Sequence, residues 1–184
     1  MLRSYQHRKT SSGHSPSGYA HPVIICLEMT SPDDLLPGKP PPSPITLAPT
    51  AAASEVQALY QRIWAPLGPS GRTGWTTAQW TAELSQPGIH TYLATIRDAP
   101  AGFAELSVEA DGVVGIVVFG LVPEVQSKGY GAAFLTAVTR TAWTLNTPTT
   151  RVWLQTSSSD HPHALRNYLQ RGFRIFDQQE RVGP

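Results

Sequence analysis

Cysteine is almost absent from this sequence, because Cys26 is the only one in 184 residues. A lone cysteine cannot form an intramolecular disulfide, so a small secreted fold held together by disulfides is excluded and a reducing cytosol is expected. Long apolar runs are also lacking. The run PVIICL (Pro22–Leu27) falls short of a secretory signal core of about 7–15 apolar residues. It is far shorter than the roughly 20 residues that span a bilayer. We therefore expect a cytoplasmic protein with no membrane segment.

Charge is scarce as well: charged residues make up 15% of the chain and the formal net charge is +1. Binding to nucleic acid or to an anionic membrane surface normally uses a strong positive field, so neither partner is expected. Hydrophobic residues make up 40% of the chain, and a chain of this length can bury a sizeable core. The composition therefore indicates one globular domain.

Proline is concentrated at one end, with eight of the seventeen prolines among the first 44 residues. Proline removes backbone donors and disfavours helix. We therefore expect residues 1–44 to form an extended or disordered leader and residues 45–184 to form the domain. Met29 is an alternative translation start to Met1, and the sequence leaves the choice open.

From residue 45 onward, apolar residues recur with regular periods. They predict the order strand, two helices, three strands, helix, strand, helix, strand, which is a mixed α/β sheet with helices on its faces. Ser54 and Asp160 are the expected N-caps of the first and last helices. The helices are expected at 54–64, 76–84, 132–145 and 160–172. The strands are expected at 45–49, 89–96, 101–108, 113–122, 151–157 and 173–176.

A glycine turn stands where the fourth of these strands ends and a helix begins, in the stretch VPEVQSKGYGAAFL. Phe134 occupies the place of the third glycine of a dinucleotide-binding fingerprint, and Lys128 precedes Gly129 instead of following a glycine as in a P-loop. What remains is Gln126-x-x-Gly129-x-Gly131 at a helix N-terminus. Consecutive amides there, with the helix dipole, favour a pyrophosphate, and Lys128 can pair with a peripheral phosphate.

These residues resemble a known family. Gln126-x-x-Gly129-x-Gly131-Ala132 is similar to the acetyl-CoA signature of the GCN5-related N-acetyltransferases (GNATs), and VVFGLVPE before it resembles the end of the family's fourth strand. About thirty residues further on, a second passage resembles the family's Ala-x-x-x-Tyr-x-x-x-Gly-Phe step from helix to strand. The resemblance covers Ile45 to about Phe176. It implies the GNAT fold, a mixed and mostly antiparallel central sheet with helices on both faces. The residues of the second signature are Ala164, Tyr168, Gly172 and Phe173.

The resemblance implies an enzyme that moves an acetyl group from acetyl-CoA to a primary amine by direct attack on the thioester. The pyrophosphate is expected on the glycine turn, and the pantetheine arm along Leu121 and Val122. A strand amide near Leu121 is expected to face the acetyl oxygen, as an oxyanion-hole donor does. A small-molecule amine is the expected acceptor, and no metal is expected. The residues expected to bind acetyl-CoA are Leu121, Val122, Gln126, Ser127, Lys128, Gly129, Tyr130, Gly131, Ala132 and Asn167.

Two proton-transfer groups are also expected. Tyr168 stands where the family carries its general acid, and a phenol with a pKa of about 10 stays protonated at neutral pH. The alternative is a tyrosine that only packs under the sheet. The expected fourth strand carries no titratable side chain between Gly112 and Val122. Glu105 on the preceding strand is therefore the nearest candidate base, and Glu124 follows Pro123. Glu105 fits a solvent-facing strand position equally well, and a water chain can also serve as the base.

Further alternatives stay open. A non-catalytic acyl-CoA-binding sensor or interaction module has the same fold, and so does an enzyme that uses a longer acyl-CoA. A homodimer is compatible with the family. His161 and His163 lack a third ligand nearby and start a helix, so a zinc site is not expected. The Gly-rich segment between the first two helices can supply an aromatic wall for an amine, or its tryptophans can simply pack on the sheet. These tryptophans are Trp64, Trp75 and Trp80.

Overall fold

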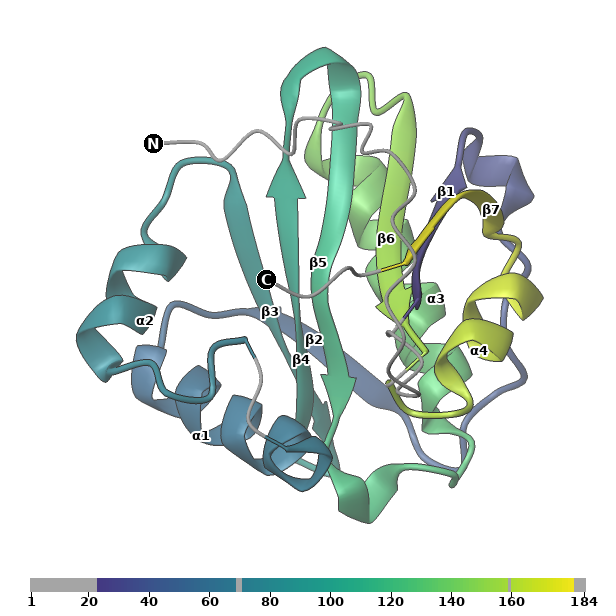
Figure 1. Ribbon diagram of the computed structural model, residues 1–184. Helices are drawn as coiled ribbons and strands as arrows, with labels where there is room; N and C mark the ends of the chain where they lie inside the picture. Colours follow the sequence, from purple (N-terminus) through teal and green to yellow (C-terminus); the bar gives the residue numbers. More distant parts are fainter. Residues whose placement is uncertain (1–22, 69–70, 159, 181–184) are drawn as a thin grey trace, which may run out of the picture.

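A single seven-stranded sheet with helices on both faces forms the molecule (Figure 1). This computed structural model describes residues 23–68, 71–158 and 160–180. The strand order is β2-β3-β4-β5-β6-β1-β7, and every neighbouring pair is antiparallel except β5 and β6. The predicted fold class is therefore confirmed. The strands are β1 (Val23–Met29), β2 (Ile45–Pro49), β3 (Ile89–Ile96), β4 (Ala99–Val108), β5 (Val113–Leu121), β6 (Arg151–Ser157) and β7 (Arg174–Glu180).

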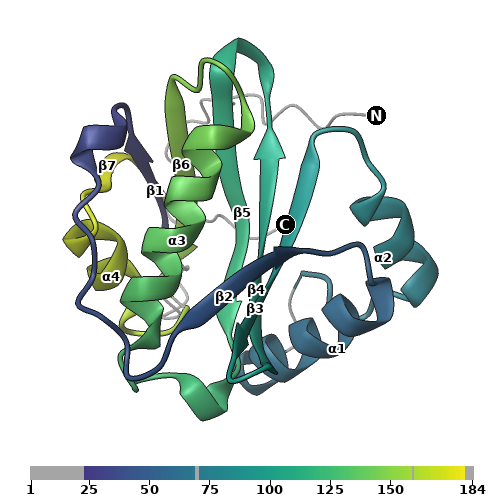
Figure 2. The ribbon, with the colours of Figure 1, turned by 180° about the vertical axis from the view of Figure 1, so that it is seen from behind.

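The helices divide between the two faces of the sheet, and Figure 2 shows α3 crossing the face opposite to that of α1 and α2. Side chains alternate across a strand, so neighbours on β4 join different cores. Phe103 packs with α1 and α2, whereas Ala104 packs with α3. The helices are α1 (Ala53–Trp64), α2 (Thr77–Leu84), α3 (Tyr130–Leu145) and α4 (Ala164–Gln170). Short 3₁₀ turns lie at η1 (Pro32–Asp34), η2 (Ala65–Leu67), η3 (Ala110–Gly112) and η4 (Pro123–Val125).

The N-terminal boundary of the domain differs from the prediction. Residues Val23–Met29 form β1, which lies between β6 and β7 and pairs with both. Leu27 and Met29 are fully buried in the core, so burial of this apolar run outweighs the helix- and strand-breaking effect of the surrounding prolines. The predicted leader 1–44 is therefore wrong for residues 23–29, and residues 1–22 lie outside the described part of the chain. Met29, the alternative start, is the last residue of this strand.

The proline-rich segment that follows β1 packs against α3. The Gly38 amide donates to Thr136 Oγ1 over 3.1 Å. A Cβ on Gly38 would lie 2.6 Å from the Cβ of Ala132, so only glycine allows the segment to come this close to the first turns of α3. The segment thus forms an outer wall beside the start of α3.

Two predicted helix caps are wrong. Helix α1 is preceded by Ala52 at the N-cap position, with no side-chain cap, and Ser54 lies inside the helix. Helix α4 begins at Ala164, and Asp160 accepts hydrogen bonds from Thr156 and Ser157 instead of capping it. By contrast, α2 begins with a capping box formed by Thr76 and Gln79.

Candidate functional site

Strands β5 and β6 separate halfway along their length. Their parallel pairing runs only from Val113 with Arg151 to Ile116 with Leu154, whereas β5 continues to Leu121 and β6 to Ser157. On its other edge, β5 stays paired with β4 as far as Leu121. Beyond Ile116, the edges of β5 and β6 that face each other therefore form no strand pairing within the described sheet.

A cavity of about 780 Å³ lies where the two strands separate. Its lining comes from the last half of β5, the turn before α3, helix α4 with the loop before it, and the end of α1. Of the residues predicted from sequence, it brings together Leu121, Gln126, Ser127, Gly129, Gly131, Ala132, Asn167 and Tyr168.

The turn at the floor of the cavity has an unusual backbone. Ser127 and Gly129 have φ values of 57° and 86°. Gly129 is the N-cap residue of α3, where no side chain caps the helix. The first amides of α3 therefore have no capping side chain, and the positive end of the helix dipole faces the same place. This arrangement suits an anionic group such as a pyrophosphate.

Gln126 and Asn167 fix the turn to its surroundings. The Gln126 Nε2 donates to the Leu121 carbonyl over 2.7 Å, which ties the turn to the end of β5. The Asn167 Nδ2 donates to the Gly131 carbonyl over 3.2 Å, which ties α4 to the first turn of α3. Both side chains line the cavity, so they position its walls and remain within reach of a ligand.

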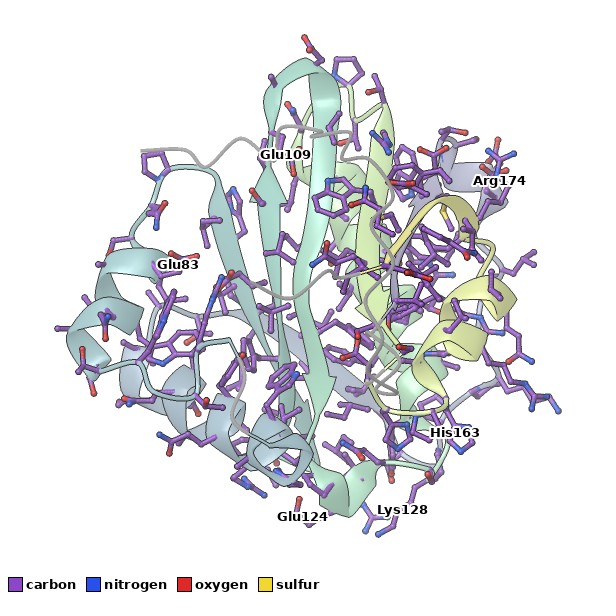
Figure 3. All side chains as sticks on the ribbon, viewed as in Figure 1. Glu83, Glu109, Glu124, Lys128, His163 and Arg174 are labelled. Atoms are coloured by element: carbon purple, nitrogen blue, oxygen red, sulfur yellow. The ribbon has the colours of Figure 1, made fainter. Side chains whose placement is uncertain are left out.

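Three of the predicted acetyl-CoA residues lie outside the cavity lining. Val122 is buried in the core under α1, and its amide donates to the Ala101 carbonyl over 2.8 Å. That amide is therefore engaged in the sheet and does not serve as an oxyanion donor. Tyr130 is 8% exposed and packs in the core under α3. Lys128 is exposed and lies at the lower edge of the molecule in the view of Figure 3.

Tyr168 projects from α4 into the cavity. The residue is 7% exposed, and its ring packs edge-on against Phe119 and Phe173. No described residue forms a hydrogen bond with its hydroxyl group. Burial raises the pKa of this phenol well above its usual value, and the charge of Asp160 adds to the rise. Tyr168 is therefore a neutral, protonated donor at physiological pH.

Glu105 lies in a different environment. It is fully buried on β4, and its two carboxylate oxygens accept hydrogen bonds from Arg72 over 2.9 Å each. Arg72 also contacts Glu83 over 2.9 Å, which lies on the α2 side of the sheet, away from His163 and Lys128 (Figure 3). Burial raises the pKa of the Glu105 carboxyl, and the Arg72 guanidinium opposes that rise. Glu105 does not line the cavity, so the structure does not bring the predicted base to the predicted acid.

Sequence reasoning missed part of the lining. Tyr60 and Pro66 line the cavity from the α1 end, together with Trp64 from the predicted aromatic wall. The wall's other two tryptophans pack elsewhere: Trp80 is fully buried, and Trp75 contacts it edge-on. A helical period that places Tyr60 and Trp64 four residues apart on one face was the available signal.

In the described part of the chain, no group of three or more His, Cys, Asp or Glu side chains is arranged to hold a metal ion. No described helix is both long enough and apolar enough to cross a bilayer.

Comparisons with known proteins agree with this geometry. A sequence model of the acetyltransferase (GNAT) family matches residues 56–173. Searching curated proteins returns no match.

Solved structures with a similar fold include a GCN5-related N-acetyltransferase from Sphaerobacter thermophilus, with 16% identity and a TM-score of 0.64, covering 87% of this chain and 50% of that one. A GCN5-related N-acetyltransferase from Kribbella flavida has 23% identity and a TM-score of 0.54, and the match covers 84% of this chain and 54% of that one. The ribosomal-protein-S18-alanine N-acetyltransferase from Escherichia coli has 20% identity and a TM-score of 0.57, and the match covers 71% of this chain and 78% of that one. The chain thus spans only about half the length of the first two structures.

Proposed function

Because the chain belongs to the GNAT acetyltransferase family, we propose that it is an acetyl-CoA-dependent N-acetyltransferase acting on a primary amine of a small molecule. The observation that carries this proposal is the cavity between β5 and β6. Its lining includes both the N-terminus of α3, which no side chain caps, and the buried, protonated Tyr168.

The turn before α3 and the edge of β5 would hold acetyl-CoA. The amides around Gly129 and Gly131 suit the pyrophosphate, and Ser127 can add a hydroxyl donor. Lys128 is exposed in this turn, and we expect it to pair with a peripheral phosphate. The unpaired edge of β5 up to Leu121 offers backbone groups to the amides of the pantetheine arm. When bound, acetyl-CoA supplies a thioester carbon that an amine can attack.

Tyr168 is the proposed general acid. The ammonium group of the acceptor first loses a proton to water. As the new C–N bond forms and the C–S bond breaks, the nitrogen releases a second proton, which water carries back to Tyr168, and the departing sulfur takes up a negative charge and needs a proton. Tyr168 lines the cavity and its hydroxyl group is not engaged by any described residue, so it can give that proton. Because burial raises the pKa of this phenol, Tyr168 is protonated at neutral pH.

Glu105 is not proposed as the base, because both of its oxygens are held by Arg72 and it lies outside the cavity lining. Its ion pair instead holds the segment between α1 and α2 against β4. The positioning of amine and thioester in one cavity supplies most of the rate enhancement, as expected when two reactants are bound side by side.

Amine-dependent release of free CoA thiol tests the proposal, with wild type compared against Tyr168→Phe. We expect kcat to fall by about 10²–10⁴ in the variant, the usual range for a general acid, while CoA affinity stays unchanged. Tyr92→Phe is the matched control, since Tyr92 lies on β3 and does not line this cavity. Full activity in Tyr168→Phe would refute the acid assignment. CoA binding without thiol release across a broad amine panel would favour a non-catalytic acyl-CoA-binding module.

A further inference from the structure

One carboxylate lines the cavity among the described residues, and it belongs to Asp160 in the loop before α4. Its Oδ2 accepts hydrogen bonds from Thr156 Oγ1 and from the Ser157 amide, each over 2.8 Å. Its Oδ1 accepts none from a described residue. The carboxylate is therefore fixed in orientation by one oxygen, and its other oxygen is left to bind a donor. Asp160 is also solvent-exposed, so a ligand that enters the cavity can reach it.

The other carboxylates near the cavity are already paired. Glu105 is held by Arg72, and Glu124 forms an ion pair with Arg62 over 3.1 Å. A positively charged ligand in the cavity therefore meets a single anionic side chain. The cationic and imidazole side chains that share the lining lie on the same loop and helix as Asp160. They are His161, His163 and Arg166.

Flat aromatic surface lines the end of the cavity formed by α1. The rings of Tyr60 and Trp64 stack with their centroids 4.4 Å apart and an angle of 21° between their planes. Trp64 is pressed onto β5, because a Cβ on Gly120 would lie 2.7 Å from its Cη2 atom. The two rings, extended by Pro66, thus present a rigid apolar wall inside the same cavity. Such a wall suits an aromatic or other flat apolar group.

The aromatic wall lies on the β5 side of the separated strands and Asp160 follows β6, and both line the same cavity as Tyr168. An ammonium group bound to Asp160 is therefore held in the cavity that also contains the group that we assign as the general acid. An apolar body attached to that ammonium group can extend toward the wall on α1.

We propose that Asp160 binds the ammonium group of the acceptor, and that the acceptor is a primary amine carried on a flat apolar body that packs against Tyr60 and Trp64. This inference rests on the proposed function and narrows its substrate class. Polyamines would leave the apolar wall unused, and amino acids would bring a second anionic group next to Asp160. Both are expected to be poorer acceptors than an arylalkylamine.

The test uses 2-phenylethylamine as the probe, and Asp160→Asn with Asp111→Asn as the matched control. Asp111 lies in an exposed turn between β4 and β5, outside the cavity lining. We expect Asp160→Asn to raise KM for the amine at least about tenfold, the effect of losing a charged hydrogen bond. CoA affinity should not change, and the control should behave as wild type. Unchanged KM in Asp160→Asn, or preference of the wild type for spermidine or glycine over 2-phenylethylamine, would overturn the inference.

A binding measurement separates this inference from the proposed function. Calorimetric titration of the CoA-saturated protein with 2-phenylethylamine and with 2-phenylethanol compares a charged and an uncharged ligand of the same shape. We expect the wild type to bind the amine at least about tenfold more tightly, and Asp160→Asn to bind the two alike. Trp64→Leu should weaken both ligands. Equal binding of the two ligands by the wild type would contradict the role of Asp160 even if the enzyme is active. Discrimination without thiol release would support the site while refuting the enzyme.

Discussion

Tyr168 links the chemistry of the site to the stability of the fold. Its phenol is buried, and its pKa lies above the value of about 10 that it has in an unfolded chain. Above pH 10 the unfolded chain therefore loses this proton while the folded chain keeps it. The contribution of Tyr168 to the free energy of unfolding is therefore fully present below pH 10. It declines as the pH rises from the pKa of the unfolded chain toward the pKa of the folded chain.

The predicted result is a steeper loss of stability at high pH in the wild type than in Tyr168→Phe. One proton released on unfolding makes a difference in slope of about 1.4 kcal/mol per pH unit. Urea unfolding at several pH values between about 9 and 11 measures it. Parallel curves for the two proteins would mean that the phenol ionises normally in the folded state, and would contradict the raised pKa of Tyr168.

Some residues of the site could be predicted from the sequence and others could not. The glycines and Gln126 of the turn could be predicted, because neighbouring residues in the sequence determine the backbone geometry that an anion needs. The environments of Glu105 and Val122 could not be predicted from the sequence. Their roles depend on partners far along the chain, Arg72 for the carboxylate and Ala101 for the amide. The free oxygen of Asp160 depends in the same way on how the loop folds back on β6.

At the scale of elements, the segment between α1 and α2 is held in place by Arg72. This side chain bridges Glu105 on β4 and Glu83 on α2, and its guanidinium lies over the rings of Trp75 and Trp80 at 4.7 and 5.4 Å. Because Glu105 is fully buried, removing Arg72 leaves a buried charge without a partner.

We predict that Arg72→Met lowers the free energy of unfolding by about 3–5 kcal/mol, the usual cost of breaking a buried ion pair. The double variant Arg72→Met/Glu105→Leu should recover most of that loss, because it removes both charges. Arg62→Met serves as the control: it breaks an exposed ion pair and should leave stability near that of the wild type. Urea unfolding monitors all three. A stable Arg72→Met protein, or an equally unstable double variant, would show that the ion pair does not hold this segment.

The elements themselves were largely predictable. The strands expected at 45–49, 89–96 and 151–157 have the bounds of β2, β3 and β6, because apolar and β-branched runs there are bounded by turn residues. The caps at Ser54 and Asp160 were not predictable, because an N-cap is decided by where the backbone leaves the extended region. The Asp160 side chain accepts hydrogen bonds from Thr156 and Ser157 of β6 and does not cap α4.

The architecture of the whole molecule places the site at the centre of the sheet. The one parallel pair, β5 with β6, is joined through α3, so the start of α3 lies at the same end as the separation of the strands. This follows from the topology of a strand-helix-strand unit and agrees with the rule that ligands bind at the carboxyl ends of parallel strands. The position of β1 between β6 and β7 was not predictable, since proline-rich sequence surrounds this strand and nothing local identifies β6 and β7 as its partners.

The account as a whole requires that CoA binds in the cavity with its pyrophosphate on the turn before α3. Calorimetric titration of CoA into the wild type, Gly129→Ala and Gly74→Ala tests this most directly. Gly129 has a φ of 86°, where a side chain is strained, whereas a Cβ on Gly74 would meet nothing within 4 Å. The account predicts that the wild type and Gly74→Ala bind CoA alike, and that Gly129→Ala binds about five- to thirtyfold more weakly, which corresponds to strain of about 1–2 kcal/mol. Absence of CoA binding in the wild type, or equal binding in all three proteins, would contradict it.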